Sequence, residues 1–596
     1  MFRSNKHHLQ PALISSINEL PEKRRRRLEE SWAGTFRAQF FSRLDEEAFA
    51  VLYSDLPSRP NVPVNVMVSL DTLKAGFGWS DEELYDHFLY DLQVRYAVGY
   101  DSLAEGDFEL RTLYNHRRRL SQYNLEHGTN LLETAFANIT DQQITALAVR
   151  TGQQRMDSTQ IASNIVIMSR LQLLVEAIQR LQRLLNEADR QRYAELLAPY
   201  AGETAGHYVH RVKGWSASGE QLQPVAQALY QLLQGMAADY GQEPAYAVAK
   251  RLFDEQCRVE TGEIQPKANK EISASSLQSL DDLEATYREK NHVGYKGYVA
   301  NLSETCDPEN PLQLITEVQV APNTAEDSQL LVEALPELKA RTDLQTLYTD
   351  GAYGGPQSDQ VLCEQRVDLV QTAICGTKPS ADQLHLADFD ITQDAQGLPL
   401  EITCPQGQTV PVVPKPKPEH FKADFDPTVC AACPLYAAGR CPPQPDNRRH
   451  TFRLNFSQAE VLKAQRHRRS RAEHHPGINL RAAVEATMRS IKHPFPAGKL
   501  PVRGQFRVTC LVIASALMTN VRRIQRYLTG IRHKLLTPEA NRPANAAGRH
   551  FADGQPGERC PTASSPWRAL RRYGTFLAAL RDRLTPSALS KPSFSA

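Results

Sequence analysis

The stretch around which this chain is organised runs Ile478-Asn479-Leu480-Arg481-Ala482-Ala483-Val484-Glu485-Ala486-Thr487-Met488-Arg489-Ser490-Ile491-Lys492. It is rich in good helix formers and is followed by His493-Pro494. Proline ends a helical run because its ring fixes φ and it lacks an N–H. The pattern therefore predicts a helix from Ile478 to Lys492.

Charged side chains fall on one side of this predicted helix. At about 100° per residue, Arg481, Glu485, Arg489 and Lys492 lie near one line that begins at Ile478. An apolar stripe runs beside that line and consists of Leu480, Val484, Met488 and Ile491. One carboxylate thus lies at the rim of a buried face among three cations, which suits a carboxylate that holds a metal ion while its neighbours hold phosphates. A ladder of i,i+4 salt bridges on a solvated face is the alternative.

Length and composition predict a globular protein of several domains. With 596 residues the chain is too long for one core, and roughly three to five domains are expected. It has no run of about 18 apolar residues and no apolar secretory signal at its start, so we expect no membrane association. Ten cysteines, several in close pairs, favour a reducing compartment and metal binding over disulfides. A cytoplasmic location is the expectation.

Positive charge is concentrated in one part of the chain, although the net charge is only +1. Residues 448–526 hold 17 Lys and Arg side chains against three acidic ones. Smaller basic clusters lie at Lys23–Arg27 and Arg117–Arg119. One such cluster alone is usually a solvated face, but the whole distribution favours a polyanionic partner. We expect that partner to be double-stranded DNA.

Two regions have helical patterns. Residues 1–140 are predicted to form an N-terminal helical DNA-binding domain, with Ser80 capping one helix. A helical bundle that only packs on the rest of the chain is the alternative. Residues 166–287 are predicted to form a helical insertion without evident chemistry.

Strand patterns lie on both sides of that insertion. Gln153–Ile161 is a predicted strand that carries Asp157, and two alternating segments, His292–Leu302 and Leu312–Val320, follow the insertion. Beyond a further helix, a short apolar strand delivers Asp350 into a glycine-rich turn. Sheets of α/β proteins place ligand-binding groups at such strand ends, although many aspartates there only form turns.

Four cysteines lie in a proline-rich insertion predicted over residues 376–454. They are Cys404, Cys430, Cys433 and Cys441. One Cys-x-x-Cys pair with two further thiols nearby fits a tetrahedral structural Zn²⁺ site, and thiols without metal are the alternative.

The order of these segments predicts an α/β fold with an RNase H-like catalytic core, in which helices flank a mixed sheet. This core would comprise residues 141–165, 288–375 and 455–528. It would bring Asp157 and Asp350 side by side and add Glu485 from the helix. Three carboxylates can hold two Mg²⁺ (or Mn²⁺) ions, which activate the attacking oxygen and stabilise the leaving one in phosphoryl transfer. The tail over residues 529–596 is predicted to be mostly disordered.

Three motifs give the chain a resemblance to a known family. Met156-Asp157-Ser158-Thr159 and Thr349-Asp350-Gly351-Ala352-Tyr353 are similar to the two aspartate motifs of the DDE transposases of bacterial insertion sequences, in particular the branch numbered 1182. Arg481, Glu485 and Lys492 fit the third motif of that family, with Ile478 where the family has tyrosine. The resemblance runs from about residue 60 to 527.

The resemblance implies a transposase that binds terminal inverted repeats, cuts the element ends and joins the freed 3′ ends to target DNA. Asp157, Asp350 and Glu485 would be the catalytic residues and the ligands of two Mg²⁺ ions. We expect contacts to DNA phosphates from Arg481, Arg489, Lys492, Arg503, Arg522 and Arg523. Pairing of two ends implies a homodimer or a larger oligomer, and the family implies a bacterial, nucleoid-associated location.

Other functions remain open at this point. One is a catalytically silent, transposase-derived DNA-binding regulator. A second is an RNase H-like nuclease that cleaves without strand transfer. A third is a scaffold whose fold depends on zinc and in which the aspartates are dispensable.

Overall fold

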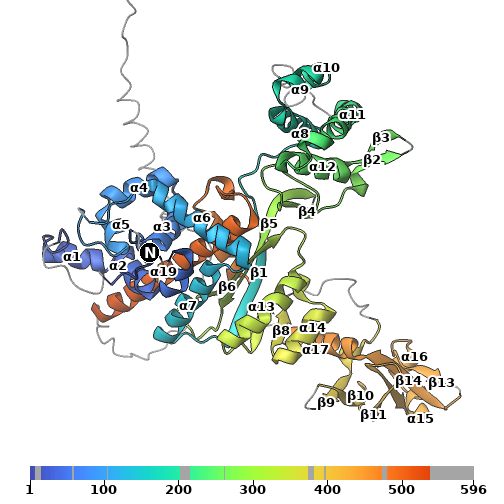
Figure 1. Cartoon of the computed structure of the whole chain (residues 1–596). Coiled ribbons are helices and arrows are strands. Elements are labelled where there is room, and N and C mark those ends of the chain that lie inside the picture. The colour runs from blue at the N-terminus through green and yellow to red at the C-terminus, as the bar shows by residue number, and fades with distance from the viewer. Residues whose placement is uncertain are drawn as a thin grey trace, which may run out of the picture. The chain divides into compact units, whose positions relative to one another are not determined.

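A computed structural model gives the fold drawn in Figure 1. It describes residues 1–6, 15–54, 56, 59–103, 105–201, 215–260, 262–290, 292–372, 382–394, 397–446, 448–472 and 480–536. The predicted tail therefore lies outside the described residues, apart from positions 529–536, which belong to the last helix. None of the helices in the described ranges combines the length and apolar character that a bilayer-spanning segment needs.

The feature that positions the predicted site is a mixed sheet of six strands. They are β1 (Gln153–Ile161), β4 (Thr286–Lys290), β5 (Val293–Thr305), β6 (Ile315–Pro322), β7 (Thr346–Thr349) and β8 (Asp368–Gln371). Strand β1 lies between β5, which is antiparallel to it, and β7, which is parallel. Strand β8 continues the parallel side, and both β4 and β6 pair with β5. Strand β1 has the bounds that the sequence predicts, and β5 and β6 overlap their predicted segments.

Different helices cover the two faces of this sheet, because side chains alternate along a strand. On one face, Met156 of β1 belongs to an apolar cluster with residues of α13 (Asp327–Arg341) and α14 (Pro356–Gln365). On the other face, Arg155 and Asp157 point toward α18 (Ala483–Lys492), which packs beside α19 (Gln505–Leu536). The charged residues of β1 thus face the predicted catalytic helix.

Helix α18 begins later than the sequence pattern predicts. Its first residue is Ala483 rather than Ile478, turns occupy residues 480–482, and residues 473–479 lie outside the described part. The carbonyl of Leu480 accepts a hydrogen bond from Arg155, and the Arg481 side chain reaches Asp157, so these residues are held by the sheet. The predicted end at Lys492 is confirmed. Val484, Met488 and Ile491 are buried, as the apolar stripe predicts.

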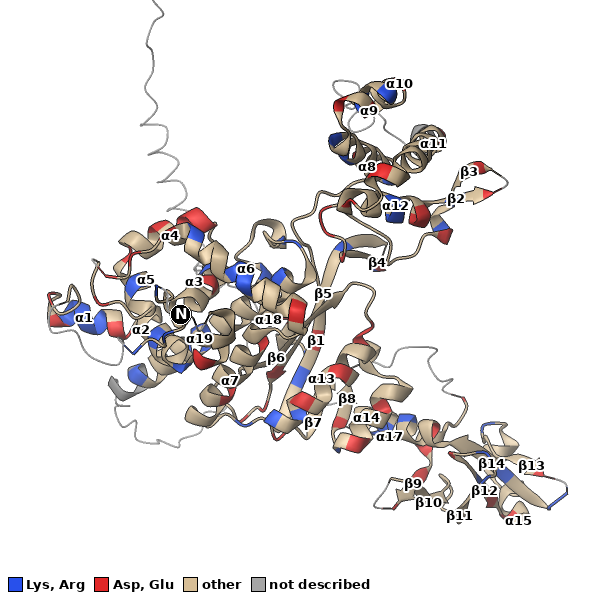
Figure 2. Ribbon diagram, viewed as in Figure 1, with Lys and Arg blue, Asp and Glu red and all other residues tan. Residues whose placement is uncertain are grey.

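Among the described residues, the first 146 positions contain α-helices joined by loops and two short 3-10 helices, Phe41–Arg43 and Glu47–Leu52. The α-helices are α1 (Glu22–Glu29), α2 (Trp32–Gln39), α3 (Val64–Phe77), α4 (Asp81–Tyr90), α5 (Leu92–Ala97), α6 (Leu110–His127) and α7 (Leu131–Ala146). Ser80 forms a capping box with Glu83 at the start of α4, where the sequence predicts a cap. Helix α3 packs on α19. Figure 2 shows Lys and Arg along α1 and α6.

A separate apolar cluster holds the region predicted as a helical insertion. Its elements are α8 (Arg170–Leu184), α9 (Glu187–Arg192), α10 (Ala194–Leu197), α11 (Trp215–Tyr240), α12 (Pro244–Gln256), β2 (Cys257–Glu260) and β3 (Glu263–Pro266). The amphipathic pattern of α8 buries Leu174, Ile178 and Leu181 in this cluster. The domain boundaries proposed from the sequence remain predictions.

The cysteine-bearing region is more ordered than its proline content suggests. It forms a second six-stranded sheet, in the order β13-β14-β12-β11-β10-β9. The strands are β9 (Asp390–Gln393), β10 (Pro399–Thr403), β11 (Thr409–Pro414), β12 (His420–Phe425), β13 (Gln444–Asp446) and β14 (Thr451–Ser457). Short helices α15 (Pro427–Ala431) and α16 (Pro434–Ala437) follow β12. Helix α17 (Gln458–Ala472) leads away from β14 and packs on α14 and β8.

Candidate active site

The three predicted acids come from three different elements. Asp157 lies in the middle of β1, and Asp350 directly follows β7, where its carboxylate accepts a hydrogen bond from the N–H of Ala352. Glu485 lies in the first turn of α18. Their side chains are 9%, 31% and 65% exposed, in that order. The exposure of the three acids thus increases from Asp157, which is buried, to Glu485, which is mostly exposed.

The parallel pairing of β1 with β7 accounts for the proximity of the two aspartates. Arg155 pairs with Tyr348, so two residues further along both strands the register leads to Asp157 and Asp350. The two carboxylates affect one another, since the charge of Asp350 raises the pKa of Asp157. Neither residue is near the other in sequence, and only the sheet brings them together.

Arg481 connects all three acids. Its guanidinium lies 3.0 Å from a carboxylate oxygen of Asp157 and 4.0 Å from one of Asp350. A second nitrogen of the same group lies 3.8 Å from Glu485. The three carboxylates therefore converge on one cation.

Burial and this cation act on the pKa of Asp157 in opposite directions. Burial raises that pKa, the Arg481 guanidinium lowers it, and the net result is a raised pKa. Burial would lower the pKa of Arg481, but the surrounding carboxylates raise it above its usual value. A site with three carboxylates and one guanidinium carries excess negative charge, which favours a further cation.

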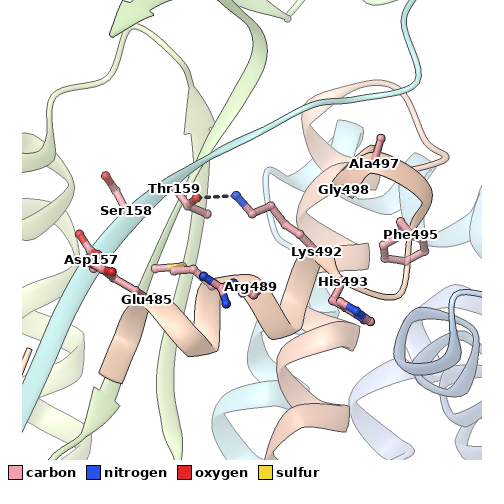
Figure 3. A pocket seen from close by; sticks show the side chains of 11 residues that line it. Asp157, Ser158, Thr159, Glu485, Arg489, Lys492, His493, Phe495, Ala497 and Gly498 are labelled. Carbon is pink, nitrogen blue, oxygen red and sulfur yellow. Dashed lines mark hydrogen bonds between the residues drawn. The ribbon is translucent and has the colours of Figure 1, made fainter. Parts of the chain in front are cut away.

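Asp157 and Glu485 line an open pocket of about 520 Å³ (Figure 3). Arg489 and Lys492, on the same helix as Glu485, also line it. The Lys492 ammonium donates to the hydroxyl of Thr159 at 2.7 Å and to the carbonyl of Gln160 at 3.4 Å. Burial lowers its pKa, because desolvation disfavours the charged ammonium. Such a group favours an anion beside the acids.

The other predicted phosphate-binding residues lie in intramolecular contacts. Arg503 donates to the carbonyl of Asn164 and lies 3.5 Å from Asp281. Arg522 donates to the carbonyl of Gly76 and lies over the Phe77 ring. Arg523 pairs with Glu304. These contacts give Arg522 and Arg523 a packing function that the sequence did not indicate.

A network around Asp350 was also missed by sequence reasoning. The side chain of Gln371 donates to the carbonyls of Asp350 and Gly351 at 3.1 Å. Arg466 of α17 donates in turn to Gln371 and pairs with Asp359. These buried groups hold the turn that presents Asp350, and no local motif identifies them.

The positions of side chains that can donate to a metal are known for the residues that the structure describes. Among them, no three His, Cys, Asp or Glu side chains are placed so that they could hold a metal ion together. At the acidic site, the cation that the carboxylates contact is Arg481.

The four predicted zinc ligands lie around a second pocket. Cys404, Cys430, Cys433 and Cys441 line it together with aromatic and aliphatic residues, and all four are free thiols. Burial and the neighbouring sulfur atoms raise the pKa of Cys441 to about 11. The backbone N–H of Gln408 lies 3.4 Å from the sulfur of Cys404, in a turn that requires the positive φ of Gly407.

Comparison with known proteins adds one finding. Residues 403–525 match the family model described as a transposase DDE domain. The matched segment contains the cysteines, Arg481, Glu485 and Lys492, whereas Asp157 and Asp350 precede it. No curated protein and no solved structure matches the chain. The match supports a DDE transposase, and with it a DNA-cleaving enzyme, without resolving a branch of that family.

Proposed function

We propose that this protein is the transposase of a bacterial insertion sequence, with Asp157, Asp350 and Glu485 as its catalytic acids. The observation that carries the proposal is the convergence of these three carboxylates on Arg481. Asp157 and Asp350 are 193 residues apart in sequence, and Asp350 and Glu485 are 135 residues apart. No local feature of the chain requires acids at such separations to share one guanidinium. The third acid lies in the segment that matches a transposase DDE domain.

The sheet supports an RNase H-like core for this site. Three parallel strands, β1, β7 and β8, adjoin an antiparallel pair formed by β5 and β6. Asp157 lies on the central strand of this arrangement, and Asp350 lies at the carboxyl end of the neighbouring parallel strand. Strand ends at this edge are where α/β proteins present reactive groups.

The chemistry of the donor set fits divalent cations, because hard carboxylate oxygens are the ligands that Mg²⁺ prefers. In the described residues these carboxylates contact Arg481, so they would have to give up part of that contact and move closer together to hold the ions. Asp157, Asp350 and Glu485 would hold them. Bound there, two Mg²⁺ ions would supply Lewis-acid activation of the attacking oxygen and charge stabilisation for the leaving one.

The other pocket residues would position the DNA. Arg489 and Lys492 would bind phosphates beside the cut, since both line the pocket with Asp157 and Glu485. Arg481 would exchange part of its contact with the acids for the phosphate that is cut. The basic helices α1 and α6 are candidates for binding the terminal repeats, and two copies of the chain would pair two ends.

The direct test uses the wild-type protein and DNA that carries the sequences flanking its own reading frame. We expect 3′ ends to be released at the element boundary in Mg²⁺, to be joined to a second plasmid, and to be absent in EDTA. Binding without cleavage would instead identify a silent regulator. Cleavage without joined products would identify a nuclease.

Replacement of Lys492 by Gln tests the phosphate contact. The substitution removes one cation but keeps a hydrogen-bonding group, so we expect affinity for end DNA to fall about tenfold near 0.1 M salt. The slope of log affinity against log salt should become shallower by about one. Fluorescence anisotropy over a salt series measures both. The control is Lys250→Gln, because Lys250 is exposed and paired with Asp254 on its own helix; equal slopes in the two variants would contradict the contact.

We also propose a structural Zn²⁺ held by Cys404, Cys430, Cys433 and Cys441. Four thiols without disulfide partners line one pocket, and a backbone N–H is directed at one of the sulfur atoms. Thiolates are the ligands that structural Zn²⁺ prefers, so the set fits this metal by its chemistry, although the side chains would have to move closer together to hold it. We expect about one Zn²⁺ per chain by elemental analysis, and none in a Cys430→Ser, Cys433→Ser double variant. Cys363→Ser, which changes an exposed thiol elsewhere, should keep its zinc. Wild-type protein purified without zinc would refute this site.

A further inference from the structure

Glu304, on β5, is a carboxylate with no exposed surface at all. One of its oxygens accepts a hydrogen bond from the Arg155 guanidinium at 2.6 Å. The other accepts from the hydroxyl of Thr487 at 2.7 Å and lies 2.7 Å from the Arg523 guanidinium. A buried carboxylate is costly unless it is paired and hydrogen-bonded, and here both oxygens are.

The partners of Glu304 adjoin the residues of the candidate active site. Arg155 precedes Asp157 by two positions, so both side chains lie on the same face of β1. Arg155 also donates to the carbonyl of Leu480 at 2.6 Å, next to Arg481. Thr487 follows Glu485 by two positions on α18. The contacts of one carboxylate therefore connect the strand of the first acid with the helix of the third.

If Glu304 served only the stability of the fold, it would not require these particular partners. Buried ion pairs contribute little net stability compared with well-packed apolar side chains, and their best-supported function is to fix one arrangement among several. The arrangement fixed here is the position of α18 on β1. Long-range bonds from Arg155 to the Leu480 carbonyl, from Arg481 to Asp157 and from Thr487 to Glu304 fasten this helix and the turn before it to the sheet.

We propose that Glu304 is a positioning residue that sets the separation of Glu485 from Asp157, and thereby the affinity of the acidic site for divalent cations. The inference rests on the proposed function. Glu304 touches neither substrate nor metal and acts through Arg155 and Thr487. Arg523, predicted from the sequence to bind DNA, completes this network from α19.

The test is Glu304→Gln, which keeps the size of the side chain but cannot accept both sets of hydrogen bonds. We expect the Mg²⁺ concentration for half-maximal end cleavage to rise about tenfold, as for groups that orient metal ligands. Affinity for end DNA should change less than about twofold. The matched control is Glu317→Gln, because Glu317 is a carboxylate on the adjacent β6 that is only 15% exposed and whose partner, Arg341, lies on the other side of the sheet from α18.

The outcomes separate the inference from the proposed function. If wild-type protein does not cleave end DNA, the proposed function fails; Mg²⁺ binding measured by calorimetry then still tests Glu304, through the same rise in the dissociation constant. If wild type cleaves and Glu304→Gln has the Mg²⁺ dependence of Glu317→Gln, the inference is overturned. Should Glu304→Gln not fold, Thr487→Val replaces it, with a smaller rise expected and with Thr487→Ser restoring the wild-type value.

Discussion

Asp350→Asn is expected to abolish end cleavage, with a rate loss of at least about a thousandfold. The substitution keeps the side-chain oxygen that accepts from the N–H of Ala352, so the turn after β7 should persist. It removes a negative charge from the set that would hold the cations. Single-turnover cleavage of end DNA measures the loss, and a thermal melt within about 2 °C of wild type would verify the fold.

Asp368→Asn is the matched control for that loss. Asp368 starts β8, at the opposite end of the parallel strands, and forms an exposed pair with Arg469. Its replacement should leave cleavage within about twofold of wild type, because exposed pairs contribute little. DNA binding should be the same for both variants and for wild type. Residual nicking by Asp350→Asn, at a rate near that of the control, would remove Asp350 from the catalytic set.

Arg481→Ala should produce two changes of opposite sign. The guanidinium contacts all three carboxylates, so it competes with a divalent cation for the same oxygens. Without it, Mg²⁺ should bind several-fold more tightly, because the bound state no longer displaces a resident cation. Cleavage at saturating Mg²⁺ should nevertheless fall by about 10² to 10³, since the donor proposed to stabilise charge on the phosphate is gone.

Calorimetry with Mg²⁺ and cleavage at saturating Mg²⁺ measure these two effects separately. Arg481→Lys retains a single point charge that cannot reach three carboxylates at once. Its Mg²⁺ affinity should therefore lie between those of wild type and Arg481→Ala. If Arg481→Ala weakens Mg²⁺ binding, the guanidinium orders the carboxylates rather than competing for them. If the cleavage rate is unchanged, Arg481 makes no contact with the phosphate.

Local patterns were sufficient for several parts of this protein. The segment Gln153–Ile161 is predicted as a strand and forms β1 with the same bounds, and the serine followed by acids predicts the cap of α4. Helix α18 ends where proline requires it to end. These features depend on backbone sterics and on hydrogen bonds between near neighbours, which a single sequence contains.

Other parts could not be predicted locally. The start of α18 is set by contacts of Leu480 and Arg481 with a strand more than 300 positions earlier. The proline-rich cysteine region is a sheet because distant segments pair, and this pairing leaves no periodic signal in its prolines. Arg523 belongs to a basic run that reads as DNA-binding, yet its nearest carboxylate is a buried glutamate on another element.

The sequence by itself determined which side chains are available: two aspartates after or within strand patterns, one glutamate among cations, and a basic segment. The tertiary structure alone decided that these acids meet at one guanidinium, that Lys492 and Arg489 face the same pocket, and that Glu304 lies behind them. The physical reason is that carboxylate proximity follows from strand register and helix packing. Both are set by burial over the whole core rather than by any short segment of the chain.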